Sequence, residues 1–268
     1  MFTLYANEKE YPIYTCNYPD NTLLCHLPAI KVNSVKWNYE NDAELFTLIC
    51  IRKHYSQHNI SLILPYIPHA RMDRVKVEED VFTLKYFCEV INSLNFDKVY
   101  VLDAHSNVSL ALLNNVVQEN VYKYIQKTIK LIDKKDLVLF FPDEGAMKRY
   151  SADLKLPYAF GIKRRDWKTG EIQSLDIINK EILNDKKVLI IDDICSRGGT
   201  FLHSARALKE AGADKVYLYV THAESTMAVG EMYNTPELVE EIYTTDSLFK
   251  KSSDILDKVV VLDAKALI

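Results

Sequence analysis

Two adjacent carboxylates followed by a pair of glycines mark the stretch of this sequence best suited to chemistry. The stretch KKVLIIDDICSRGGTF covers residues 186–201, with Asp192 and Asp193 after a short apolar run typical of a buried parallel strand. A glycine turn at 196–200 then leads into residues with helical spacing, and this arrangement presents backbone N–H groups to a phosphate. The pattern favours a divalent cation and a phosphorylated sugar over an ordinary turn with solvated acids.

A second candidate is the stretch PYIPHARMDR at 65–74, which follows an apolar run. Arg71 and Arg74 flank Asp73 there, and arginine side chains grip phosphate oxygens with two hydrogen bonds at once. The pattern predicts a cationic lip at the carboxyl end of a strand, with a solvated basic loop as the alternative.

Two further strand ends carry candidate metal ligands. VYVLDAHSN places Asp103 and His105 after a strand, and LVLFFPDEGAMKRYS places Asp143 between a strand and a helix. Histidine and aspartate at such positions bind divalent metals or phosphates. The alternatives are a solvated loop histidine and an aspartate that merely caps its helix.

A second basic cluster occurs in FGIKRRDWKTGEIQ, where Lys163, Arg164 and Arg165 follow an apolar strand. A local basic cluster in a mildly acidic protein suits a small anionic ligand. A solvated loop is again the alternative.

Composition excludes several classes of function. The 268-residue chain has a net charge of −4, so it lacks the overall basic field of a protein that binds nucleic acid or an anionic membrane. Its five cysteines form no C-x-x-C pair, which excludes a zinc site or a disulfide framework, and Cys195 is not needed as a nucleophile. No stretch resembles a secretion signal or a membrane span, so we expect a cytoplasmic protein.

An internal echo predicts a duplicated architecture. DKVYVLDAHS begins at Asp97 and DKVYLYVTHAES at Asp214, and the same spacing separates Thr83 from Thr200 at the start of two helices. Alternating strands and helices predict an α/β protein with mainly parallel sheets flanked by helices. We expect an N-terminal domain at 1–135 and a C-terminal domain at 136–268, with the tail DKVVVLDA returning to the first domain.

Taken together, these motifs resemble one family. The two acids and Gly-Gly-Thr resemble the ribose-phosphate signature of type I phosphoribosyltransferases. The other blocks, in order, resemble the ribose-phosphate diphosphokinases (PRPP synthetases), whose segments read P-Y-x-x-Y-A-R-Q-D-R, D-x-H, S-P-D-x-G-x-x-x-R and D-K-R-R. The resemblance runs from about Asp42 onward and implies two tandem phosphoribosyltransferase-like domains that share one active site.

The resemblance also implies roles. Arg71, Asp73, Arg74 and His105 bind ATP, and Lys163 and Arg165 close over the reacting phosphates as the catalytic cations. Mg²⁺ is held by His105, Asp143 and Asp192. The ribose phosphate is bound by Asp192, Asp193, Ser196, Arg197, Gly198, Gly199 and Thr200.

The chain departs from the family pattern at several positions. His69, Met72, Phe141 and Gly161 replace the usual Tyr, Gln, Ser and Asp. The F-x-D-G-E segment, which shapes the family's adenine pocket across a subunit contact, has no counterpart in HLPAIKVNSVKWNYEND. Adenine recognition and assembly are therefore the least transferable features, although we expect at least a homodimer with contacts from the first half.

The implied reaction transfers the β,γ-diphosphate of ATP to the anomeric hydroxyl of a ribose 5-phosphate group, giving PRPP or a similar product and AMP. A PRPP-using phosphoribosyltransferase and an inactive regulatory homologue are the alternatives. The first needs neither the arginine block nor the duplication, and the second should have lost its catalytic cations.

Arg197 leaves the acceptor open, because the family usually has Asp-Thr where this chain has Ser196 and Arg197. The guanidinium either extends into solvent, or adds a contact to a monophosphate, or reaches a second phosphate. The last arrangement favours a 5-substituted acceptor such as ADP-ribose, which would give ADP-ribose pyrophosphate.

Overall fold

The computed structural model describes residues 1–165, 172–250 and 258–264, without the side chains of 163–165 and 172–174. It divides into two compact units, Met1–Asn120 together with Ala264, and Val121–Asp263. The predicted boundary after residue 135 thus differs from the observed one. Helix α4 (Tyr122–Ile132) belongs to the second unit, because it contacts helix α5 (Glu144–Leu154) there.

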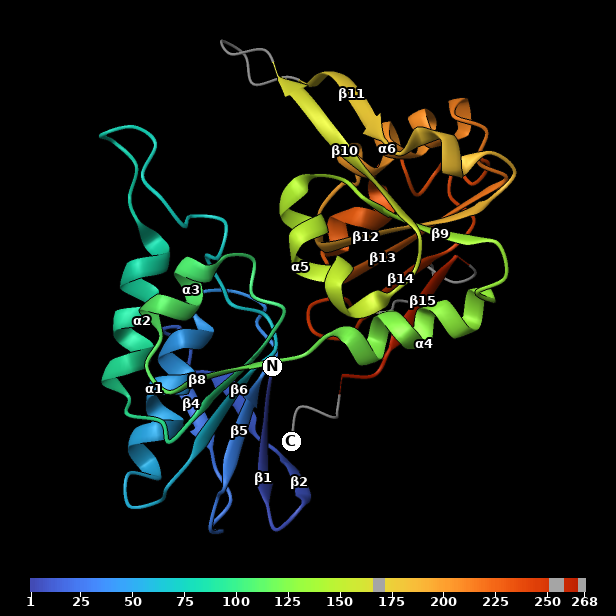
Figure 1. Ribbon diagram of the computed structural model, residues 1–268. Coiled ribbons are helices and arrows are strands. Elements are labelled where there is room, and N and C mark those ends of the chain that lie inside the picture. The colour runs from blue at the N-terminus through green and yellow to red at the C-terminus, as the bar shows by residue number, and fades with distance from the viewer. Residues whose placement is uncertain (166–171, 251–257, 265–268) are drawn as a thin grey trace. The chain divides into compact units, whose positions relative to one another are not determined.

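The first unit contains a six-stranded sheet in the order β2-β1-β5-β6-β7-β8. Strands β5 to β8 are parallel, whereas β1 is antiparallel to both β2 and β5. Helices α1, α2 and α3 cover one face of the sheet (Figure 1). The strands are β1 (Phe2–Ala6), β2 (Lys9–Pro12), β5 (Ser34–Trp37), β6 (Ser61–Leu64), β7 (Val99–Leu102) and β8 (Val116–Glu119); the helices are α1 (Glu44–His54), α2 (Thr83–Ser93) and α3 (Asn107–Leu112); a separate hairpin joins β3 (Tyr14–Asn17) to β4 (Leu23–His26).

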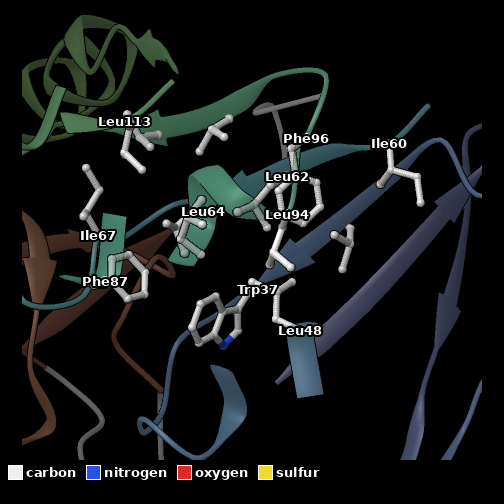
Figure 2. Close-up of a cluster of buried hydrophobic side chains, with 14 of the residues drawn as sticks. Trp37, Leu48, Ile60, Leu62, Leu64, Ile67, Phe87, Leu94, Phe96 and Leu113 are labelled. Atoms are coloured by element: carbon white, nitrogen blue, oxygen red, sulfur yellow. The ribbon is translucent and has the colours of Figure 1, made fainter. Parts of the chain in front are cut away.

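The core of this unit lies between the sheet and its helices. Trp37, Leu62 and Leu64 from the strands meet Leu48 of α1 and Phe87 of α2 (Figure 2). These side chains are almost fully buried, and burying each stabilises the fold by about 1.5–3 kcal/mol. The packed layer fixes the parallel strands, so the segments that follow β5, β6 and β7 emerge at one edge of the sheet.

The second unit contains a seven-stranded sheet in the order β11-β10-β9-β12-β13-β14-β15. All neighbouring strands are parallel except β10 and β11, which form an antiparallel hairpin at the edge. The strands are β9 (Leu137–Phe141), β10 (Tyr158–Arg165), β11 (Ile172–Ile178), β12 (Lys187–Cys195), β13 (Lys215–Ala223), β14 (Ile242–Thr245) and β15 (Val259–Leu262); besides α4 and α5 the unit has α6 (Gly199–Glu210) and the 3₁₀ helices η1 (Lys180–Leu183) and η2 (Ser225–Val229).

The direction in which successive strands are added to this sheet reverses between β9 and β12. From β9 the chain passes through α5 to β10 on one side, and from β12 it passes through α6 to β13 on the other. Because such crossovers are right-handed, α5 and α6 cover opposite faces. The crevice at the carboxyl ends of β9 and β12 is where open α/β sheets bind ligands.

The predicted α/β class with mainly parallel sheets is confirmed. The tail predicted to return to the first domain divides between the units. Its strand β15 pairs with β14 at the edge of the second sheet, whereas Ala264, the last residue described, groups with the first unit. None of the helices in the described part of the chain combines the length and apolar character needed to cross a bilayer.

Candidate active site

The two acids of the second unit lie inside a strand. We expected the acids to stand at the end of the strand, but β12 continues through them to Cys195, because its end pairs with β13, Ile194 opposite His222 and Cys195 opposite Ala223. The side chains of Asp192 and Asp193 lie close enough to interact with each other. Asp193 is buried, with 6% of its surface exposed, and Asp192 is half-buried.

Charged residues of helix α5 and of its N-cap act on the two acids in different ways. Arg149 lies 3.6 Å from Asp193, between Nη1 and Oδ2, and its guanidinium lies over the ring of Tyr150. Burial raises the pKa of Asp192 well above its usual range, and the negative charges of Asp193 and Asp143 raise it further. The crevice therefore favours a cation or a hydrogen-bond donor beside Asp192. Sequence reasoning assigned no role to Arg149, although it ends the quoted D-x-G-x-x-x-R block.

Asp143 caps helix α5. Its Oδ1 accepts a hydrogen bond from the backbone N–H of Ala146 at 3.0 Å. A Cβ atom at Gly145 would lie 3.2 Å from the same oxygen, so a small residue lets the helix begin this close to the carboxylate. The capping role weighed from the sequence is thus confirmed, and the helix holds Asp143 near the β12 acids.

The 196–200 loop opens helix α6 through a left-handed residue. Gly198 has φ +81°, a conformation that side chains disfavour, and its carbonyl accepts from Leu202 at 2.9 Å. No side chain of the described residues caps this helix, so the first N–H groups of α6 are available to an anion. Ser196 and Thr200 are half-buried, and Gly199 and Arg197 are exposed.

A later segment, residues 224–232, supports this loop from behind. The N–H of Glu224 donates to the Cys195 carbonyl at 2.8 Å, and the hydroxyls of Ser196 and Thr226 are 3.3 Å apart. A Cβ at Gly230 would lie only 2.0 Å from the carbonyl oxygen of Arg197. The sequence did not predict that residues 224–232 pack against the loop. The local sign of such a close approach is the glycine that follows Met-Ala-Val, Gly230.

A buried hydroxyl cluster joins the ends of β13 and β14. His222 Nδ1 lies 2.7 Å from Ser247 Oγ, and Thr245 Oγ1 donates to the Thr221 carbonyl at 2.7 Å. All four residues are at most 2% exposed. The cluster fixes the strand that leads into the 224–232 segment, and it too was missed, because its members are distant in sequence.

Cys195 ends β12 without reactive character. Burial raises the pKa of its thiol to about 12, and the charge of Asp192 adds to the effect. The thiol therefore stays protonated at neutral pH, which agrees with the prediction that Cys195 is not a nucleophile.

In the first unit, the predicted ATP-binding residues lie on an irregular segment after β6. Arg71 and Arg74 are exposed, Asp73 is half-buried, and the Arg74 Nε lies 3.6 Å from Asp73 Oδ1. Asp103 and His105 follow β7, the neighbouring strand; Asp103 is 1% exposed with φ +44°, and His105 is half-buried. Both groups thus emerge at the carboxyl edge of the first sheet.

Some predicted residues are not brought together by the structure. Lys163 and Arg165 belong to β10, with Lys163 opposite Leu175, but their side chains lie outside the described residues. His105 belongs to the first unit and Asp143 to the second, and the two units are described separately. No group of three or more His, Cys, Asp or Glu side chains within the described ranges is arranged to hold a metal, and Mg²⁺ stays a prediction.

Comparison with known proteins agrees with this geometry. Residues 112–256 match the family model of the phosphoribosyl transferase domain. The chain is 30% identical over 234 residues to a ribose-phosphate pyrophosphokinase of Mycoplasma pneumoniae, covering 83% of this chain and 70% of the relative. It is 29% identical to the enzyme of the same name from Thermosipho africanus, covering 85% of this chain and 72% of that one.

A solved structure shares the fold. Phosphoribosylpyrophosphate synthetase from Mycobacterium smegmatis matches with a TM-score of 0.74 at 17% identity, covering 94% of this chain and 86% of that one. The sequence matches and the shared fold point to the same family as the carboxylate pair on β12 and the glycine loop that follows it. The chain belongs to the ribose-phosphate pyrophosphokinase family of transferases.

Proposed function

We propose that this protein transfers the β,γ-diphosphate of ATP to the anomeric hydroxyl of a 5-phosphorylated ribose. The observation that carries the proposal is the carboxylate pair of β12 leading into the uncapped N-terminus of α6. Carboxylates suit ribose hydroxyls, and a helix N-terminus suits a phosphate. The names of the relatives support the same substrate class.

In this proposal the anomeric oxygen attacks the β-phosphorus of ATP. The bond between that phosphorus and the oxygen bridging to the α-phosphate breaks, AMP leaves, and the hydroxyl proton passes to solvent. Asp192 and Asp193 hold the ribose hydroxyls, and the 196–200 backbone binds the 5-phosphate. Lys163 and Arg165 neutralise the charge that develops on the diphosphate.

Residues of the first unit hold the donor. Arg71 and Arg74 bind phosphates of ATP, and Asp73 aligns Arg74 through their 3.6 Å ion pair. Both guanidiniums are exposed, so they can bind a phosphate without disrupting buried packing.

The residues present fit a magnesium ion. The pKa of Asp192 is raised because it lies buried near the charges of Asp193 and Asp143, and a hard cation would relieve that repulsion. Mg²⁺ usually takes one or two carboxylates together with substrate phosphates, so Asp143 and Asp192 would hold it. When bound, the ion supplies neutralisation of phosphate charge.

Incubation with ATP, Mg²⁺ and ribose 5-phosphate tests the proposal directly. We expect AMP and a diphosphorylated ribose in equal amounts. If AMP never appears with any ribose phosphate acceptor, the transferase proposal is wrong. If the protein instead releases diphosphate from PRPP in the presence of a nucleobase, the alternative phosphoribosyltransferase is correct.

Lys163→Ala separates an enzyme from an inactive regulatory homologue. We expect turnover to fall by about 10²–10³-fold, because a cation that stabilises the transferring group is lost. Circular dichroism should be unchanged. A low background of AMP formation that Lys163→Ala leaves intact would favour the regulatory homologue.

A second candidate acceptor, ADP-ribose, is favoured by the state of Arg197. Its side chain is exposed and makes no ion pair or hydrogen bond within the described part of the chain, whereas the Ser196 hydroxyl lies near Thr226. A guanidinium beside a phosphate loop is placed to meet a second phosphate, which ADP-ribose carries and ribose 5-phosphate lacks.

The ratio of kcat/KM for the two acceptors tests this candidate. If ADP-ribose is the acceptor, Arg197→Thr should lower kcat/KM for ADP-ribose about tenfold or more and leave that for ribose 5-phosphate within about threefold. A wild-type protein that strongly prefers ribose 5-phosphate, or a ratio that Arg197→Thr leaves unchanged, would reject it.

We also propose a homodimer or larger assembly, with contacts made by the first unit. Sedimentation of the active protein as a monomer alone would exclude it.

A further inference from the structure

Three polar residues at the carboxyl edge of the first sheet have no role in the proposed function so far. Tyr39 and Asp42 follow β5, and His69 follows β6. The Tyr39 hydroxyl donates to Asp42 Oδ1 at 2.9 Å, and His69 Nε2 lies 3.0 Å from the same oxygen. One carboxylate oxygen therefore ties together two loops that are distant in sequence.

His69 is held in an unusual conformation. Its φ is +63°, in the left-handed region that non-glycine residues rarely adopt. Such residues persist where the surroundings determine them, and they cluster at ligand sites. The ring packs beside Phe87, with centroids 5.6 Å apart, and leaves 25% of the side chain exposed. His69 is thus oriented, yet open on one side.

The hydrogen bond to Asp42 selects the form of the imidazole. A carboxylate only accepts, so Nε2 must carry the proton, and in the neutral ring Nδ1 then presents a lone pair. Among the described residues Nδ1 has no hydrogen-bond partner. This nitrogen can therefore accept a hydrogen bond from a ligand.

Two tyrosine rings lie on the same loops: Tyr39, which shares the Asp42 oxygen with His69, and Tyr66, which contacts Tyr39. Tyr39 lies 5.7 Å from Trp37 and 6.4 Å from Tyr66, measured between ring centroids, and both tyrosines are half-buried. Burial raises the pKa of Tyr39 to about 12, with the Asp42 hydrogen bond adding to it, so the phenol stays a donor. Partly exposed aromatic rings offer a stacking surface for a planar base.

The position in the chain matches a base next to phosphates. His69 lies two residues before Arg71 on the segment proposed to hold ATP phosphates. The region 26–42 also lacks an F-x-D-G-E segment, so base recognition requires other residues.

We infer that Tyr39, Asp42 and His69 bind the base of the donor nucleotide and set its preference for adenine. Nδ1 of His69 accepts a hydrogen bond from the 6-amino group of adenine, whereas guanine would oppose its 6-carbonyl oxygen to the same lone pair. The inference rests on the proposed function for the identity of the donor. The simpler alternative is a latch that only holds the two loops together.

Equilibrium binding of ATP and GTP, each without acceptor, separates these readings. We expect wild-type protein to bind ATP at least about tenfold more tightly than GTP. Asp42→Ala frees the imidazole to present either nitrogen, and His69→Phe keeps a ring but removes the acceptor. Both variants should weaken ATP binding about fivefold to tenfold, leave GTP nearly unchanged, and so abolish the preference.

Asp20→Ala is the matched control, because Asp20 accepts only from Thr22 in its own turn. It should leave both affinities unchanged. Equal losses for ATP and GTP in Asp42→Ala would mean a latch, and a wild-type protein without adenine preference would also overturn the inference. If His69→Phe does not fold, Asp42→Ala decides alone. Selective ATP binding without any AMP formation would reject the proposed reaction while the inference stands.

Discussion

The two regions proposed to bind phosphates are built in opposite ways. The 196–200 loop of the second unit is a backbone site, formed by strand β12, a left-handed glycine and the first turn of α6, and supported by residues 224–232. The 71–74 segment of the first unit is a side-chain site, in which exposed arginines extend from irregular backbone.

The difference predicts which changes each region tolerates. A backbone site depends on the path of the chain, so it is sensitive to any added atom that moves the loop. A side-chain site depends on a few charges, so it is sensitive to their removal and to salt.

Asp192→Asn should cause the largest loss. The amide keeps the shape but loses the charge that binds ribose hydroxyls or a cation, and we expect kcat/KM to fall about 100-fold. Steady-state kinetics at saturating Mg²⁺ measure it. A loss under about fivefold would show that this backbone site does not need its acids.

The same variant should be more stable than wild type at neutral pH. The folded-state pKa of Asp192 is raised, so its ionised form opposes folding above that pKa, and the effect vanishes below the unfolded pKa. In EDTA, Asp192→Asn should therefore raise Tm at pH 7.5, by about 2–4 °C for each kcal/mol recovered, and not near pH 3. A gain of equal size at both pH values would contradict this cause.

Gly230→Ala should damage the loop from behind. The added Cβ would lie 2.0 Å from the Arg197 carbonyl oxygen, so the loop must move. Such overpacking costs about 1–3 kcal/mol, which predicts an acceptor KM raised about tenfold or more with ATP binding unchanged. Thr226→Ala removes two exposed hydroxyl contacts of 3.3 Å, to Ser196 and Glu224, without adding any atom to the loop, and should be nearly neutral. Equal effects of the two variants would refute the backbone character of the site.

Arg74→Ala should weaken ATP binding without harming the fold. Its guanidinium is 76% exposed, so we expect Tm to stay within about 1 °C and the KM for ATP to rise about fivefold to tenfold. The loss should shrink at high salt, where exposed charges are screened. Titrating KM against salt checks this, and a salt-independent loss would argue for a buried role.

Ser247→Ala should have the smallest effect on activity. It removes one hydroxyl of the cluster with His222, which should lower the free energy of unfolding by about 1–3 kcal/mol and change kcat/KM less than about threefold. Ser93→Ala, which removes an exposed hydroxyl bound to Val90, is the matched control for denaturant unfolding. A tenfold loss of activity in Ser247→Ala would move the cluster into the binding machinery.

Local sequence determined much of this protein. Asp143 lies between strand β9 and helix α5, as predicted from the stretch LVLFFPDEGAMKRYS. The acid pair and the glycine turn were also visible, because the residues that build them are adjacent in the chain. The formation of such features depends on residues only a few positions apart, so the local sequence is enough to predict them.

Tertiary structure decided what depends on distant partners. The antiparallel pairing of β1 with β5, the placement of α4 and the pairing of β15 all arise from contacts that no local pattern records. The same holds in the sites, where Arg149 meets Asp193, and Asp42 meets His69. Nothing in the local sequence of either residue identifies its partner, and only the packing of the sheets and helices brings the two side chains within reach of each other.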